Sequence, residues 1–170
     1  MITAEQIGRR VRRLSREIDE DYSQGTLHVV GVRENSCTFV ADFVRLLHCP
    51  VVCSFLSVAT EDCSWHGFPL RHITCTPRPA VENKDVLLVD GILQTGVTLE
   101  FLLSSVQSRG PKSARTAVLI EKSNYKRAGN VPDYVGFKTR EDFLVGYGIA
   151  CEGTYRELPY IGALERPAPR

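Results

Sequence analysis

The sequence lacks the roughly 18 consecutive apolar residues that a transmembrane helix needs, so we expect no membrane partner. It also lacks an excess of one charge, because 21 lysines and arginines stand against 20 aspartates and glutamates. This near balance argues against an acidic disordered chain and against a strongly basic nucleic-acid binder. The first residues have neither the basic flank nor the apolar stretch of a signal peptide. We therefore expect a cytoplasmic protein that does not bind nucleic acid.

The sequence has no C-x2-C pair among its six cysteines, although such pairs are typical of zinc sites. Most of the cysteines lie in apolar runs, and a chain of this length can form a core without disulfides. We interpret them as buried free thiols, with a zinc site as the alternative. The one cluster that fits a metal consists of Cys49, Cys53, Cys63 and His66.

The N-terminal segment predicts an amphipathic helix. Thr3 and Gln6 form a capping-box pattern, and apolar residues then recur at helical spacing from Ile7 to Ile18. The opposite face is rich in arginine, which we interpret as a solvated surface, with a polyanion-binding patch as the alternative. The arginines are Arg9, Arg10, Arg12, Arg13 and Arg16.

Short β-branched runs then alternate with helical segments. We expect strands at 27–32, 51–57, 71–75, 85–89, 114–120, 133–137 and 143–147, and helices after Ser36 and over 99–106. Residues 59–70 show no period and are expected to form a loop. The alternation predicts an α/β fold, with about six mostly parallel central strands and helices on both faces. One domain should span 1–164, followed by a frayed C-terminal tail at 165–170.

The segment from Val86 to Thr98 is the most informative part of the chain. A buried strand runs into Thr95-Gly96-Val97-Thr98, and a helix begins at once. Backbone N–H groups and two hydroxyls would then meet the positive end of the helix dipole, beyond the carboxyl end of the strand. Ordinary turns use the same residues, so the prediction depends on this placement. We predict that a phosphate monoester binds Gln94, Thr95, Gly96, Val97 and Thr98.

Further segments make nearly the whole chain resemble the type I phosphoribosyltransferases, and in particular the bacterial hypoxanthine-guanine phosphoribosyltransferases. These segments are residues 3–7, 110–113, 132–137, 145–148 and 158–162. The resemblance implies a parallel sheet with flanking helices, a small hood over the site, and 5-phosphoribosyl-1-pyrophosphate as ligand. It also implies transfer of the phosphoribosyl group to N9 of a purine, with Mg2+ holding the diphosphate, and it suggests a homo-oligomer.

The resemblance assigns roles outside the phosphate turn. Lys122 would contact the exocyclic oxygen of the purine. Phe143 would stack on the base, and the backbone of Leu144 would read the edge of the base. From the residues alone, Lys122 also fits a surface position and Phe143 also fits the core. On the pyrophosphate side, Arg156 would reach the diphosphate, while Arg33 and Glu34 occupy a turn where the family has a lysine-glycine pair.

The sequence departs from the family pattern at the acids. Where the family has two adjacent acids, Asp90 is followed by Gly91, which leaves Asp90 as the one candidate metal ligand and ribose contact. Gln94 replaces the aspartate that handles the proton, so Asp90 and Gln94 form a degenerate catalytic pair. Ala150 replaces an aspartate that coordinates a second magnesium ion. Mg2+ binding is therefore in doubt.

The altered loops add to these losses. Glu34 would bring negative charge close to a diphosphate, and the loop that should cover the site has Thr60-Glu61 in place of Ser-Tyr. Our main hypothesis is a protein that binds a purine nucleotide or phosphoribosyl pyrophosphate, with weak or lost transferase activity. The first alternative is an active purine-salvage enzyme that makes IMP or GMP. The second is a regulatory or scaffold subunit, which the arginine-rich helix face supports.

Overall fold

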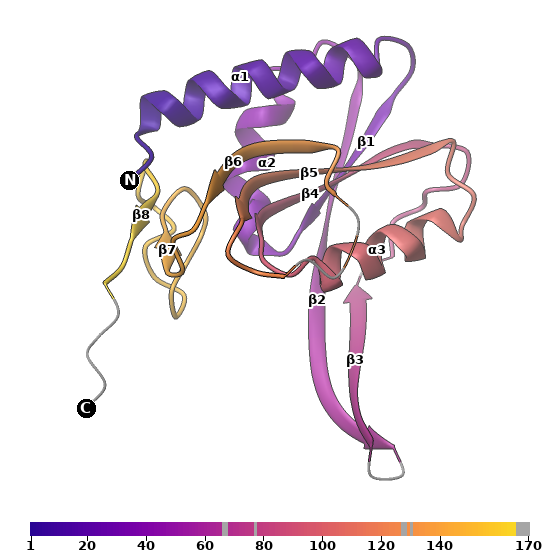
Figure 1. The fold of residues 1–170 in the computed structure, drawn as a ribbon. Helices are drawn as coiled ribbons and strands as arrows, with labels where there is room; N and C mark the ends of the chain where they lie inside the picture. Colours follow the sequence, from indigo (N-terminus) through magenta and orange to yellow (C-terminus); the bar gives the residue numbers. More distant parts are fainter. Residues whose placement is uncertain (66–67, 77, 127–128, 130, 166–170) are drawn as a thin grey trace.

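The computed structural model describes residues 1–65, 68–76, 78–126, 129 and 131–165. They form a six-stranded central sheet of order β3-β2-β1-β4-β5-β6, in which β3 alone runs antiparallel to its neighbour (Figure 1). The predicted mostly parallel sheet is thus confirmed. The strands are β1 (Leu27–Val32), β2 (Val51–Trp65), β3 (Phe68–Thr76), β4 (Asp85–Leu93), β5 (Ser113–Lys122) and β6 (Tyr134–Thr139).

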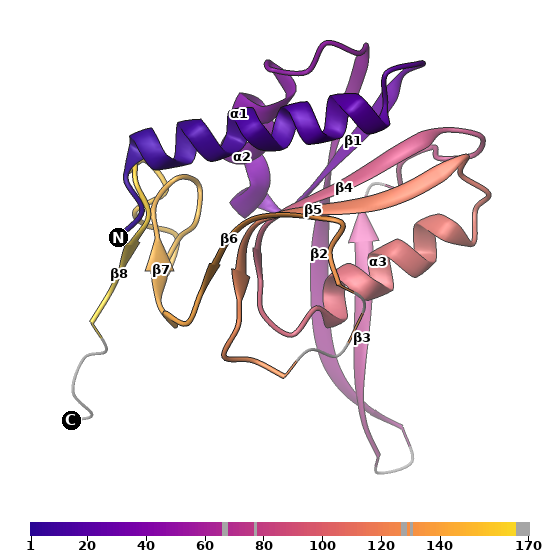
Figure 2. The same ribbon diagram turned by 45° about the horizontal axis from the view of Figure 1, so that its top comes forward.

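Helices cover both faces of this sheet, as expected. Helices α1 (Ala4–Asp21) and α2 (Cys37–Val44) pack on one face, and α3 (Val97–Gln107) packs on the other (Figure 2). Side chains of a strand alternate between the two faces. Accordingly, Leu87 and Val89 of β4 join the core cluster under α1 and α2, whereas Val86 and Leu88 join the cluster under α3. Burial on both faces explains the uninterrupted apolar stretches 86–89 of β4 and 117–120 of β5.

The arginine-rich face of α1 is engaged within the chain. Arg10 donates from Nε to the carbonyl of Gly136 at 2.8 Å and from Nη2 to the carbonyl of Val135 at 2.6 Å, which ties α1 to β6. Arg9 and Arg13 each form an ion pair with a glutamate of the same helix. These contacts favour a structural and solvated face over a polyanion-binding patch.

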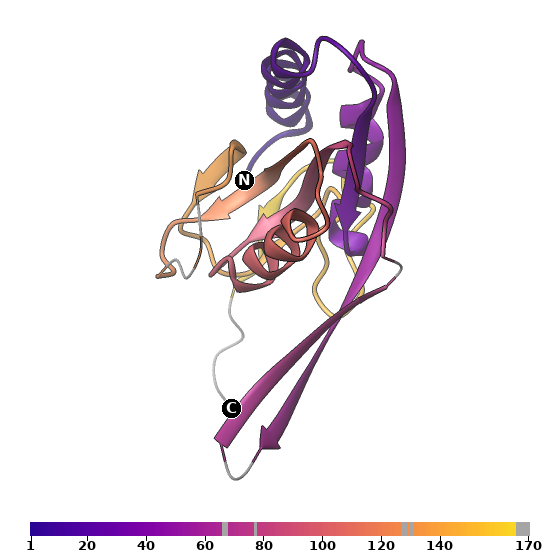
Figure 3. The same cartoon turned by 90° about the vertical axis from the view of Figure 1, so that its right-hand side faces the viewer.

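The loop expected at 59–70 is wrong within the described residues. There, β2 and β3 form an antiparallel hairpin that pairs Ser57 with Thr76 and Trp65 with Phe68. The hairpin extends beyond the body of the molecule (Figure 3). Its two strands satisfy each other's backbone N–H and C=O groups, so they need no apolar alternation facing a core.

The strand expected at 143–147 is also shorter than expected. Only β7 (Leu144–Val145) is extended, and it pairs with β8 (Gly162–Ala163) in a separate two-stranded sheet. Backbone φ is 103° at Gly146 and 51° at Tyr147, values that a β-strand does not contain. This sheet and the turns around it form the small C-terminal unit that corresponds to the expected hood. Of the tail expected to fray, 166–170 lie outside the described residues.

Four of the six cysteines are described as free thiols, and these four are less buried than expected. Cys37 and Cys53 are exposed, and Cys49 and Cys151 are half-buried. Cys53 and its neighbour Val52 point to opposite faces of β2, and both are exposed. No described helix is long and apolar enough to span a membrane.

Candidate functional site

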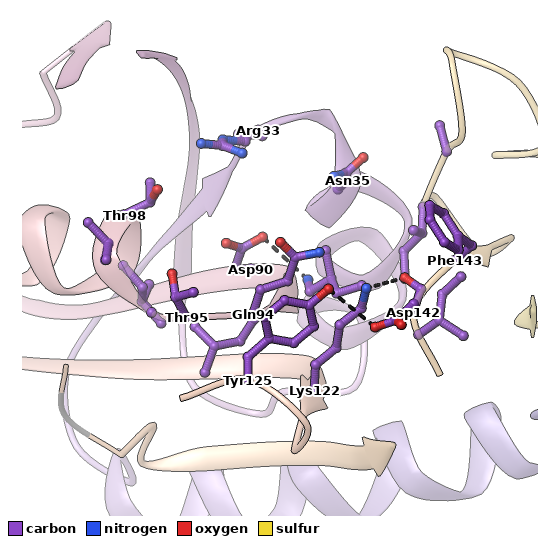
Figure 4. A pocket seen from close by; sticks show the side chains of 18 of the residues that line it. Arg33, Asn35, Asp90, Gln94, Thr95, Thr98, Lys122, Tyr125, Asp142 and Phe143 are labelled. Atoms are coloured by element: carbon purple, nitrogen blue, oxygen red, sulfur yellow. Dashed lines mark hydrogen bonds between the residues drawn. The ribbon is translucent and has the colours of Figure 1, made fainter. Parts of the chain in front are cut away.

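A cavity of about 400 Å³ lies at the carboxyl ends of β1, β4 and β5 (Figure 4). Ligands of open α/β sheets bind at this edge, where the loops after parallel strands converge. The walls come from the turn after β1, the β4–α3 turn, the end of β5 and the segment around β7. They comprise Arg33, Asn35, Asp90, Ile92, Leu93, Gln94, Thr95, Gly96, Val97, Thr98, Leu99, Lys122, Tyr125, Asp142, Phe143, Leu144, Ile149, Ala150 and Cys151.

All five residues of the predicted phosphate turn, 94–98, line this cavity. Gly96 is the N-cap of α3 and has a φ of 84°, a left-handed conformation that suits glycine. The first N–H groups of a helix have no partner within the helix and carry partial positive charge. Figure 4 shows the side chains of Thr95 and Thr98, which both belong to this turn. The turn therefore has the geometry of an anion site, and phosphate binding there remains a prediction.

Asp90, near the end of β4, is the buried acid of the cavity. Its side chain is 8% exposed, and Oδ1 lies 3.5 Å from the backbone N of Ile92. Burial raises the pKa of Asp90 to about 6, although the N–H groups of Ile92 and Gly91 and the charge of Arg33 oppose this rise. The carboxylate is therefore ionised at neutral pH but is held in a costly environment.

The raised pKa of Asp90 predicts a pH-dependent stability. The folded protein binds this proton more tightly than the unfolded chain, so the free energy of unfolding should fall as pH rises from 3.8 to about 6. Asp90→Asn should remove this fall and raise the free energy of unfolding at pH 8 by about 2–3 kcal/mol. Urea denaturation between pH 4 and pH 8 measures it, with exposed Glu82→Gln as the control for lost charge. An unchanged pH slope in Asp90→Asn would contradict the assignment.

Lys122, at the end of β5, is buried rather than on the surface, with 3% of it exposed. Its Nζ donates to the carbonyl of Asp142 and lies 5.6 Å from the ring centroid of Tyr125. The Asp142 carboxylate in turn accepts from Asn124 at 2.7 Å and from the Tyr125 hydroxyl at 3.2 Å. Burial lowers the pKa of Lys122, and the charge of Asp142 opposes that effect. An ammonium is thus held at the cavity wall.

Phe143 and Leu144, which the resemblance assigns to the base, also line this cavity. Phe143 is 43% exposed, so it is not the core residue that its sequence context also allowed. Leu144 is 9% exposed. Sequence reasoning missed Tyr125 and Asp142, which line the same wall. They lie in loops without a motif, and the one available signal was an aromatic residue shortly after the end of β5.

The residues predicted for the pyrophosphate side do not all line this cavity. Arg33 lines the cavity, whereas Glu34 is exposed and is not among the lining residues. Arg156 donates from Nη1 to Asn35 Oδ1 at 2.5 Å and to the carbonyl of Gly148 at 2.6 Å. It lines a second cavity of about 660 Å³ beside α1 and α2. Glu34 therefore does not face the cavity, and Arg156 supports its wall from behind.

The side chains of the cavity do not fit a protein-held magnesium ion. Mg2+ requires octahedral oxygen ligands, and proteins usually supply them with one or two carboxylates together with substrate phosphates. Here Asp90 is accompanied by the charge of Arg33, and the second acid of the cavity, Asp142, already accepts hydrogen bonds from Asn124 and Tyr125. At Gly91 an added Cβ would overlap the carbonyl group of Asn35, and Ala150 has no oxygen ligand.

The described residues contain no group of three or more His, Cys, Asp or Glu side chains that could hold a metal. His66 and the side chain of Cys63, part of the cysteine cluster, lie outside the described residues.

Comparisons with known proteins agree with this geometry. The family model "Phosphoribosyl transferase domain" matches residues 1–151. A hypoxanthine-guanine phosphoribosyltransferase of Dictyostelium discoideum is 34% identical over 97% of this chain and 94% of its own length. One of Staphylococcus epidermidis is 33% identical, over 97% and 92%. The structure of Trypanosoma cruzi hypoxanthine phosphoribosyltransferase with its product IMP has a TM-score of 0.87 and 30% identity, over 97% and 92%. The chain therefore belongs to the phosphoribosyl transferase domain family.

Proposed function

We propose that this protein is a purine-salvage phosphoribosyltransferase, which joins hypoxanthine or guanine to the ribose of 5-phosphoribosyl-1-pyrophosphate. The observation that carries the proposal is that the phosphate turn 94–98, Asp90, Lys122 and Phe143 all line one cavity. The names of the relatives, which cover 97% of the chain, favour an active enzyme over the weakened one expected from the acids.

In this proposal each wall of the cavity binds one part of the nucleotide. The N–H groups at the start of α3 bind the 5′-phosphate. Asp90 accepts hydrogen bonds from the ribose hydroxyls. Lys122 donates to the exocyclic oxygen of the purine, and Phe143 stacks on its ring. The ammonium of Lys122 favours 6-oxopurines over adenine, because an exocyclic amine cannot accept a hydrogen bond from it.

The reaction forms a bond from N9 of the purine to C1′ of the ribose, breaks the bond from C1′ to the diphosphate oxygen, and releases the imidazole N–H proton of the base to water. Positioning the base and stabilising the leaving group supply much of the acceleration of such a reaction. Gln94 can donate its amide N–H to N7, but it cannot accept a proton near neutral pH. We expect transfer without a general base at this position, and hence a rate below that of a site with an aspartate.

A second candidate is a protein that binds a purine nucleotide but does not transfer the phosphoribosyl group at a useful rate. Gly91, Gln94 and Ala150 favour it, since each lacks an acid that the family resemblance implies. Such a protein could act as a regulatory or scaffold subunit.

Two measurements on the same protein test the proposal. Calorimetric titration with IMP should detect binding, and chromatography should detect GMP formed from guanine and phosphoribosyl pyrophosphate. IMP binding together with GMP formation supports the proposed enzyme. IMP binding with no GMP above the uncatalysed background supports the second candidate and rejects the first. If IMP does not bind, neither function holds.

A further inference from the structure

We propose that the guanidinium of Arg33 binds the diphosphate of the phosphoribosyl substrate directly, in the role of a magnesium ion, so that diphosphate binding needs no divalent cation. The inference rests on the proposed function, because diphosphate is the leaving group of that reaction. It starts from the observation that the cavity side chains do not fit a magnesium site. It names the positive charge that this chain provides in place of the metal.

The backbone at Arg33 has a conformation that almost only glycine adopts. Its φ is 60° and its ψ is 174°, which is costly for a residue with a side chain and persists only where the surroundings fix it. Here the N–H of Arg33 donates to the carbonyl of Leu56 at 2.9 Å, and its carbonyl accepts from the hydroxyl of Ser36 at 3.0 Å. Ser36 is fully buried. The turn after β1 is therefore pinned on both sides of this residue.

The consequence of this conformation is the direction of two neighbouring side chains. Arg33 lines the cavity, while Glu34 is exposed and does not. Figure 4 shows the Arg33 side chain extending towards the side of the cavity where Thr98 and the start of α3 lie, with Asp90 below it. The strained turn thus presents the positive side chain to the ligand and keeps the negative one out.

The Arg33 side chain also has unused hydrogen-bonding capacity. Its Nε is buried and has no hydrogen-bond partner among the described residues. A buried donor without a partner is costly, so a ligand that accepts from it is favoured. Arginine offers five N–H donors in a rigid planar fork, which matches the oxygens of a phosphate group in pairs. The ligand that suits this donor is therefore a multiply charged oxyanion.

The small number of acidic side chains in the cavity also favours an anionic ligand. A site with several carboxylates repels diphosphate unless a divalent cation is bound, whereas Gly91, Gln94 and Ala150 contribute no negative charge. Two acids remain, and the Asp142 carboxylate already accepts two hydrogen bonds from Asn124 and Tyr125. The lack of acids at 91, 94 and 150 and the presence of the Arg33 guanidinium both make the cavity less negative. Together they let the site attract an anion without a metal.

Calorimetric titration with inorganic pyrophosphate, in EDTA and in Mg2+, tests this proposal. Wild-type protein should bind pyrophosphate in EDTA, with a Kd within about threefold of the value in Mg2+. Arg33→Gln should weaken pyrophosphate binding by about tenfold or more, because a hydrogen bond to a charged group is lost. Arg33→Lys, which keeps the charge and loses the fork, should fall between them. Arg16→Gln, on the exposed face of α1, removes the same charge and should leave the Kd unchanged.

The outcomes separate this inference from the proposed function. If wild-type protein binds IMP but binds pyrophosphate only with Mg2+, or if Arg33→Gln binds pyrophosphate as wild type does, the role of Arg33 is refuted and the proposed function stands. If wild-type protein binds neither IMP nor pyrophosphate, the proposed function fails as well. Should Arg33→Gln not fold, Arg33→Lys and the wild-type comparison in EDTA decide the matter.

Discussion

Replacing Gly96 with valine should weaken IMP binding by about 100-fold or more, which corresponds to about 2.7 kcal/mol. Gly96 has a φ of 84° at the N-cap of α3, and a β-branched residue is a severe outlier in that region. Valine would have to rotate the backbone or place its methyl groups against the ligand. Either change disturbs the N–H groups that we expect to hold the phosphate. Calorimetric titration with IMP measures the effect.

A matched control exists at the other end of α3. Gly110 also has a positive φ, 65°, but an added Cβ there meets nothing within 4 Å and the residue does not line the cavity. Gly110→Val should therefore carry a comparable backbone penalty and bind IMP as wild type does. Equal loss of IMP affinity in the two variants would mean that the Gly96 result reflects stability rather than the site.

Replacing Gln94 with aspartate should accelerate GMP formation by about 100-fold over Gln94→Asn. Aspartate and asparagine have the same shape, so their comparison isolates the ability to accept a proton. Gln94 lines the cavity at the start of the phosphate turn, where its side chain can reach a bound purine. Steady-state GMP formation from guanine and phosphoribosyl pyrophosphate measures the effect. If the two variants have equal rates, proton transfer at residue 94 does not limit the reaction.

Adding the other acids should not extend this gain. On the sequence alone, aspartates at 91, 94 and 150 together would restore the family pattern. In the structure, a Cβ at residue 91 would lie 2.8 Å from the carbonyl carbon of Asn35, so Gly91→Asp should destabilise the fold by about 1–3 kcal/mol. The triple variant should therefore form GMP more slowly than Gln94→Asp with Ala150→Asp. A triple variant that is both as stable as wild type and faster than the double variant would refute this steric argument.

The central strands were predictable because their signal is local. Both faces of β1 and β4 are buried, so the runs at 27–32 and 85–89 are mostly apolar, although β4 continues past Asp90 to Leu93. The hairpin of β2 and β3 has no such signal, because its strands leave the core and pair with each other. The turns at 146–148 need a positive φ at Tyr147, and no sequence pattern predicts a positive φ at a tyrosine.

The candidate site was predictable where a motif follows a strand. The turn at 94–98 is of this kind, whereas the role of Lys122 was implied only by the family resemblance. Contacts between distant segments were not predictable. The overlap of residue 91 with Asn35, the hydrogen bond from Arg156 to Asn35 and the exposure of Glu34 all depend on how the turn after β1 sits beside β4. These contacts decide which charges reach the cavity.

The most direct test of the central claim is a crystal structure of the protein with IMP. The account predicts the 5′-phosphate at the backbone N–H groups of residues 95–98, the ribose hydroxyls at Asp90, and the base between Lys122 and Phe143. A nucleotide bound with its phosphate in the second cavity, beside α1 and α2, or with its base away from Lys122 and Phe143, would contradict it.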